Sequence, residues 1–99
     1  MDTAVFTARI MPLIRTLEER SERHTAQSAF VHLVEEIGEI ARQLTNKEHR
    51  PEKYDPENLG AELADALMFL VLVAERSNID LPVEMEKAIG RLEAKITKA

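Results

Sequence analysis

Two pairs of acidic residues in this chain have the spacing that brings carboxylates together on one face of a helix. Glu36 and Glu39 are three residues apart within residues 35–40, and Glu62 and Asp65 are three apart further along the chain. Residues at this spacing in a helix are neighbours, with Cβ atoms about 5–6 Å apart. If two such helices face each other, four carboxylates point at one place.

Four ionised carboxylates cannot share a small volume, because each negative charge raises the pKa of the others. A divalent cation removes this conflict, and a site made only of oxygen ligands suits Mg²⁺ or Mn²⁺. A single acidic pair on a helix is usually solvated surface. Both pairs here border apolar residues, where unpaired charge is costly. We therefore predict that helices present a metal site made of Glu36, Glu39, Glu62 and Asp65.

The pattern around these pairs predicts an all-α fold, a protomer resembling a four-helix bundle. Apolar residues recur at helical spacing in four stretches, and the alternation typical of strands is rare. The predicted helices cover residues 3–22, 26–44, 56–76 and 81–98. Thr25, Asp55 and Asp80 are suited to cap the last three helices. Asn78 can take the left-handed conformation that ends the third helix.

Three local features carry further expectations. Pro12 lies inside the first stretch, so we expect either a kink near residues 8–11 or a helix that starts later. Residues 45–55 contain Asn46 and Pro51 and are predicted to form a loop. The charged run at the end of the first helix is interpreted as a solvated face. It consists of Glu18, Glu19, Arg20, Glu22 and Arg23.

Length and composition limit the classes of protein. We predict one all-α domain over residues 1–99, the size of a common domain. The net charge of −5 and the scattered basic residues argue against a nucleic-acid partner. The absence of cysteine excludes disulfides and thiolate metal sites. We find no signal peptide and no apolar run near the ~20 residues that span a bilayer, so we expect a cytoplasmic protein without a membrane partner.

The third predicted helix is apolar on nearly every side from Leu63 to Ala74, except at Asp65. A helix that is apolar all round must be buried all round, and four short helices from one chain cannot cover it completely. We therefore predict a homo-oligomer, either a dimer or a tetramer, whose interface includes part of this helix.

The acidic pattern resembles the signature of the MazG-like nucleotide pyrophosphohydrolases, within the wider all-α NTP pyrophosphohydrolase group. The signature, EExxE followed by ExxD, reads here as Glu35-Glu36-Ile37-Gly38-Glu39 and Glu62-Leu63-Ala64-Asp65. The resemblance covers roughly residues 25–95, including a similar turn at residues 78–81. It implies hydrolysis of nucleoside triphosphates to the monophosphate and pyrophosphate with Mg²⁺. It also implies helical bundles that assemble as dimers or as dimers of dimers.

Carried over residue by residue, the resemblance gives roles to the acids. It implies that Glu36, Glu39, Glu62 and Asp65 are the metal ligands. Glu35 would orient a ligand or the attacking water, so Glu35, Glu36 and Glu39 are the expected catalytic residues.

The groups expected to contact substrate are a histidine and three cations. His32 faces the acidic strip of the second predicted helix. Lys87, Arg91 and Lys95 on the last helix are candidates for the phosphates. Gly90 stands about where the family commonly has an asparagine, which is a departure from its pattern.

Two alternatives stay open. Phosphoribosyl-ATP pyrophosphohydrolases are similar in fold and acidic spacing, but they usually carry a lysine shortly before the paired acids. Residues 30–34 contain no lysine, so we rank this reading second among enzymes. A non-catalytic helical interaction module is the alternative from a different class, and it predicts no dependence on Mg²⁺. The sequence does not indicate which nucleotide is preferred.

Overall fold

The computed structural model describes residues 1–98, which are helical with no strand in that range. The all-α prediction with four helices is confirmed. The α-helices are α1 (Thr3–Arg20), α2 (Ala26–His49), α3 (Pro56–Arg76) and α4 (Leu81–Lys98), and the short 3-10 helix η1 (Pro51–Lys53) joins α2 to α3. In the described part of the chain, no helix combines the length and hydropathy needed to cross a membrane.

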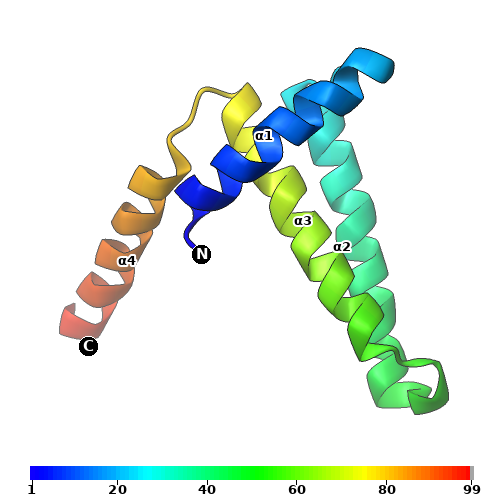
Figure 1. The fold of residues 1–99 in the computed structure, drawn as a ribbon. Coiled ribbons are helices and arrows are strands. Elements are labelled where there is room, and N and C mark those ends of the chain that lie inside the picture. The colour runs from blue at the N-terminus through cyan, green and yellow to red at the C-terminus, as the bar shows by residue number, and fades with distance from the viewer. Residues whose placement is uncertain (99) are drawn as a thin grey trace.

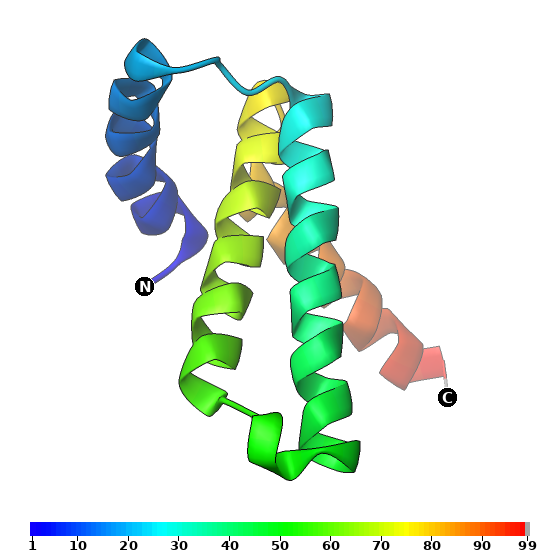
Figure 2. The same cartoon turned by 90° about the vertical axis from the view of Figure 1, so that its right-hand side faces the viewer.

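Helices α2 and α3 form an antiparallel hairpin, the main packing unit of the chain (Figure 1). The second view shows the two helices side by side along their length (Figure 2). Helix α1 lies against the end of the hairpin where α2 begins and α3 ends. There Met11 packs with Ala29 and Leu72 to form the small buried core.

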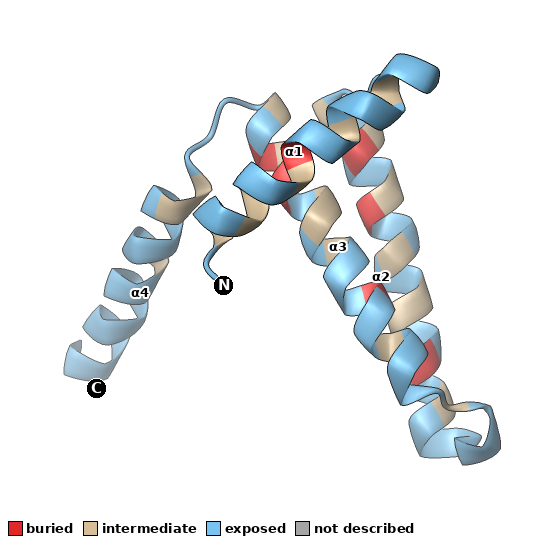
Figure 3. Ribbon diagram, viewed as in Figure 1, coloured by how far each residue is buried: buried red, intermediate tan, exposed pale blue. Residues whose placement is uncertain are grey.

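Helix α4 diverges from the hairpin and contacts mainly α1 (Figures 1 and 2). Buried residues occur on the other three α-helices, whereas α4 has none among residues 81–98 (Figure 3). The four helices of one chain therefore do not close into the bundle that was expected of the protomer. Large apolar side chains on α2, α3 and α4 consequently keep 40% or more of their surface exposed.

The predicted helix ends are largely confirmed. Thr25 and Ser28 form a reciprocal capping box at the start of α2. The Asp55 carboxylate accepts the N–H groups of residues 57 and 58 at the start of α3. Asn78 has a φ of 56°, the left-handed conformation expected after α3. The Asp80 carboxylate accepts the N–H of Val83 at 3.3 Å at the start of α4.

Helix α1 begins at Thr3, as predicted, and continues through Pro12, so the alternative of a later start is wrong. The Asp2 carboxylate accepts the N–H of Val5 at 2.9 Å as a cap. One predicted boundary is wrong. Helix α2 does not end near residue 44 but continues to residue 49. No proline occurs within α2, and Pro51 disfavours helical geometry at Arg50, the residue just after the helix ends. Most of the predicted loop is therefore helix.

Candidate metal centre and its surroundings

Glu36, half-buried on α2, is under the influence of acids from both helices of the hairpin. Partial burial raises its pKa above the ordinary 4.5, and the negative charges of Asp65, Glu62, Glu39 and Glu35 raise it further. Acids on α3 are therefore near enough to a carboxylate of α2 to affect its pKa. The single metal site that the spacing predicts stays a prediction.

Glu62 is the most buried of these acids, with 8% of its surface exposed. Its Oε1 accepts a hydrogen bond from the side chain of Asn58 at 3.2 Å. Its Oε2 is buried and has no hydrogen-bond partner among the described residues. A buried carboxylate oxygen without a partner is costly, and native structures rarely leave one unexplained. The donor set therefore fits a hard divalent cation, which would satisfy this oxygen.

The more exposed acids have weak partners on their own helix. Glu39 lies 3.4 Å from the guanidinium of Arg42, and Glu35 lies 3.7 Å from the ring of His32. In the positions that they occupy, no three His, Asp or Glu side chains of residues 1–98 are close enough to hold an ion. Exposed pairs of this kind contribute about 1 kcal/mol or less, so they would compete only weakly with a cation.

His32 belongs to a cluster of three rings beside the acids. The ring of His32 stacks on that of Phe69 with centroids 5.2 Å apart. The ring of His24 packs edge-on against the ring of His32, with centroids 4.9 Å apart. Phe69 is one helical turn beyond Asp65, and His32 is one turn before Glu36. The ring cluster (His24, His32 and Phe69) therefore adjoins the acidic region.

His24 was not among the predicted site residues. It lies just before α2, where its Nδ1 is 3.3 Å from the hydroxyl of Ser28. A weak signal was present in the sequence, since His24, Ser28 and His32 recur every four positions, although His24 itself precedes the helix.

The family model described as the MazG nucleotide pyrophosphohydrolase domain matches residues 24–99. The chain belongs to this family. No curated protein and no solved structure matches at a significant level. The MazG match includes both acidic pairs and begins at His24, so α1 lies before it.

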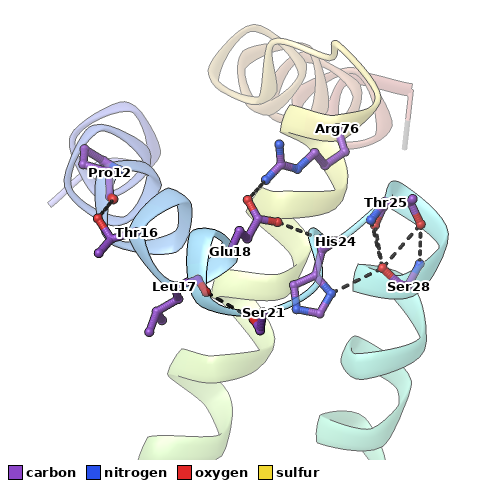
Figure 4. Close-up of polar contacts among 9 residues, drawn as sticks. All are labelled: Pro12, Thr16, Leu17, Glu18, Ser21, His24, Thr25, Ser28 and Arg76. Carbon is purple, nitrogen blue, oxygen red and sulfur yellow. Dashed lines mark hydrogen bonds and ion pairs between the residues drawn. The ribbon is translucent and has the colours of Figure 1, made fainter.

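One end of α1 is fastened to the MazG domain by a buried ion pair (Figure 4). The Arg76 guanidinium, on α3, donates to one oxygen of Glu18, and the backbone N–H of His24 donates to the other at 2.6 Å. Only 10% of the Glu18 side chain and 11% of the Arg76 side chain are exposed. The prediction that the whole charged run is solvated is therefore wrong for Glu18. Glu18 is one turn after Ile14, which packs on the core, so it shares the inner face of α1.

The three candidate cations of the MazG domain lie on α4, away from the acidic region. Lys87 pairs with Glu84 on its own helix at 3.3 Å, and Arg91 and Lys95 are exposed. Because α4 diverges from the hairpin, the structure does not bring these three side chains to the acids of the same chain.

Proposed function

We propose that this protein is a Mg²⁺-dependent nucleoside triphosphate pyrophosphohydrolase that releases the nucleoside monophosphate and pyrophosphate. Membership of the MazG family, whose members generally depend on a divalent metal, supports a pyrophosphohydrolase. The observation that carries the proposal is the buried Oε2 of Glu62, which has no hydrogen-bond partner among the described residues. The raised pKa of Glu36, to which acids of both helices contribute, agrees with it.

The acids have separate roles in this proposal. Glu36, Glu39, Glu62 and Asp65 would hold the cation, which would supply neutralisation of phosphate charge. Glu35 holds the attacking water or orients a ligand. Water oxygen bonds to the α-phosphorus while the bond from that phosphorus to the bridging oxygen breaks, the water proton passing to the Glu35 carboxylate and the bonding electrons leaving with pyrophosphate. The carboxylates thus meet the anionic substrate only when a cation is bound, since phosphate and carboxylate otherwise repel each other.

The remaining substrate contacts come from two directions. His32 lies at the boundary between the acids and the ring cluster, where it can contact the nucleoside side of the substrate. The cations Lys87, Arg91 and Lys95 bind phosphates only if they come from another copy of the chain, because α4 diverges from its own hairpin.

The exposed apolar residues support a homo-oligomer, a dimer or a dimer of dimers. One side of the hairpin carries apolar side chains at helical spacing, each with 42–53% of its surface exposed. These are Phe30, Val34, Ile37 and Leu44 on α2 and Leu63, Leu67 and Leu70 on α3. Exposed apolar rows of this extent mark interaction surfaces. The acids lie on other faces of the two helices, so this assembly leaves them open to substrate.

Pyrophosphate release tests the proposal. We expect purified protein to release pyrophosphate from common nucleoside triphosphates with Mg²⁺ and none after chelation. Glu39→Ala should reduce the rate by more than about 100-fold, since even residues behind a metal ligand cost 10–100-fold. Glu48→Ala, at an exposed position of the same helix, is the matched control and should keep full activity. Full activity in folded Glu39→Ala protein would rule out the proposed site.

A thermal melt separates this proposal from a non-catalytic helical module. A ligand that binds only the folded state increases the free energy of unfolding, by about 2.7 kcal/mol when its concentration is 100 times its Kd, and so raises the melting temperature. We expect Mg²⁺ to raise the melting temperature of the native protein and not that of Glu39→Ala. A melt unaffected by Mg²⁺ in both proteins supports the interaction module.

A further inference from the structure

Of the four candidate metal ligands, Glu62 is the buried one, and a neighbouring amide holds it. Glu36 and Glu39 are half-buried and Asp65 is exposed. The side-chain amide of Asn58, one turn earlier on α3, donates to Oε1 of Glu62 at 3.2 Å. Oε2 of the same carboxylate is buried and has no hydrogen-bond partner in residues 1–98. The Asn58 amide therefore fixes one oxygen of Glu62 and leaves the other oxygen for a ligand.

The way α3 begins leaves the Asn58 side chain free for this contact. Asn58 is the third residue of α3, a position from which a polar side chain often reaches back to the backbone N–H of the capping residue. Here that N–H, of Asp55, donates instead to Oε1 of Gln43 at 3.0 Å. The Asp55 carboxylate accepts the backbone N–H of Asn58 at 3.3 Å. The side chain of Asn58 can therefore turn forward along α3, toward Glu62.

Gln43 links this start of α3 to α2. Gln43 and Glu62 are the two polar residues that are buried within residues 1–98, each with 8% of its surface exposed. Buried polar side chains are retained at low cost only where hydrogen bonds satisfy them, and such bonds also fix their geometry. A continuous series of hydrogen bonds thus runs from Gln43 on α2, through Asp55 and Asn58, to the candidate ligand Glu62.

We propose that Asn58 is a positioning residue for the metal site, because its amide holds the Glu62 carboxylate so that Oε2 is presented to the cation. The inference rests on the proposed function and adds to it the residue that prepares one ligand. A ligand that is already fixed loses little side-chain freedom when a cation binds. Hydrogen-bond partners of metal ligands typically contribute 10–100-fold to metal affinity, and we expect Asn58 to do the same.

Binding of Mn²⁺ tests this without any turnover, because the electron paramagnetic resonance signal of free Mn²⁺ falls as the ion binds. We expect Asn58→Leu to weaken Mn²⁺ binding about tenfold or more. Leucine is similar in size to asparagine and has the higher helix propensity, so α3 should form as before. Asn58→Gln keeps an amide donor and should recover most of the affinity. Asn46→Leu makes the matched change on α2 and should bind Mn²⁺ as the native protein does.

The outcomes separate this inference from the proposed function. Equal Mn²⁺ affinity in the native protein and Asn58→Leu, or a loss that Asn58→Gln or Asn46→Leu shares in full, overturns the positioning role even if pyrophosphate is released. A loss in Asn58→Leu that Asn58→Gln recovers supports the role even if no triphosphate is hydrolysed. A native protein that binds no Mn²⁺ overturns the positioning role and the metal site together.

Turnover supplies a second readout that a merely structural role would not move. If hydrolysis occurs, Asn58→Leu should raise the half-saturating concentration of Mg²⁺ about tenfold and leave kcat at saturating Mg²⁺ unchanged. A kcat that falls to the same extent at every Mg²⁺ concentration would instead show that Asn58 supports the fold rather than the ligand, and would overturn the inference.

Discussion

The α2–α3 hairpin and the two outer helices differ in how they are held. The hairpin is packed along its length and carries both acidic pairs. Helix α1 is held by Met11 and Ile14 at the core and by one ion pair, and α4 has no fully buried residue among those described. The hairpin therefore owes its form to packing between its two helices, whereas α4 is positioned mainly by its contacts with α1.

One partly buried glutamate in each region has a shifted pKa, and the two shifts have opposite directions. Glu18, on α1, has a pKa below the ordinary 4.5. Burial alone would raise it, but the N–H of His24 and the charge of Arg76 outweigh burial. Glu36, on the hairpin, has a raised pKa because burial and four acids act in the same direction. Charge thus stabilises the attachment of α1 and destabilises the hairpin, which is expected of a structural contact and a ligand site respectively.

The largest effect expected is on turnover, from Glu36→Gln. This change removes a ligand and should reduce Mg²⁺-dependent pyrophosphate release by more than about 100-fold. It also removes the charge that burial and its neighbours disfavour, so at neutral pH, in a chelator, the variant should unfold at a higher temperature than the native protein. As pH falls, the native Glu36 takes up a proton early and this difference should shrink. A variant that is both inactive and less stable would indicate a structural role for Glu36.

The next effect is on assembly, from Ile37→Glu. Ile37 lies in the exposed apolar row of α2, and a charge there should dissociate the oligomer, as measured by sedimentation at fixed protein concentration. Val31→Glu is the matched control, because the two side chains are 52% and 51% exposed. Val31 lies about 120° round the helix from Ile37, outside the row. Equal mass for the native protein and both variants would contradict the proposed interface.

The sequence predicted what depends on near neighbours in the chain. The helix starts at Thr25, Asp55 and Asp80 follow from side chains that cap the backbone a few residues away. The common face of each acidic pair follows from three-residue spacing on a helix, and α2 and α3 do pack as neighbours. The convergence of the four acids on one ion stays a prediction.

The sequence did not predict what depends on distant partners. Glu18 stands in a run of charges, and its burial is decided by Arg76, which is 58 residues away. The ring of His24 meets Phe69 across the hairpin, 45 positions later in the chain. The direction in which α4 leaves the hairpin likewise could not be predicted from the sequence of α4. The pattern of an amphipathic helix shows which face is apolar but not what covers that face.

A smaller effect is expected on stability, from Glu18→Ala. Removing one member of a buried ion pair leaves the other charge without a partner and typically costs about 3–5 kcal/mol. We expect the lower end, about 3 kcal/mol, in denaturant unfolding, because a tenth of each side chain remains exposed. Glu19→Ala, at an exposed neighbouring position, should change stability by less than about 0.5 kcal/mol. Similar losses in the two variants would show that the ion pair does not fasten α1.

The smallest effect is a pH dependence that isolates the ion pair from the acidic site. Because the folded pKa of Glu18 lies below its ordinary value, the unfolded chain takes up this proton first as pH falls. The stability that Glu18 contributes is therefore complete above the ordinary carboxyl range and is lost as pH falls through the lowered folded pKa.

Glu18→Gln lacks this titration, so the difference in unfolding free energy between native and variant should be constant near neutral pH and shrink in acid. The opposite contribution of Glu36 is common to both proteins and cancels in the difference. A difference that stays constant from about pH 7 to pH 3 would mean that the Glu18 carboxylate is not held by Arg76 in solution.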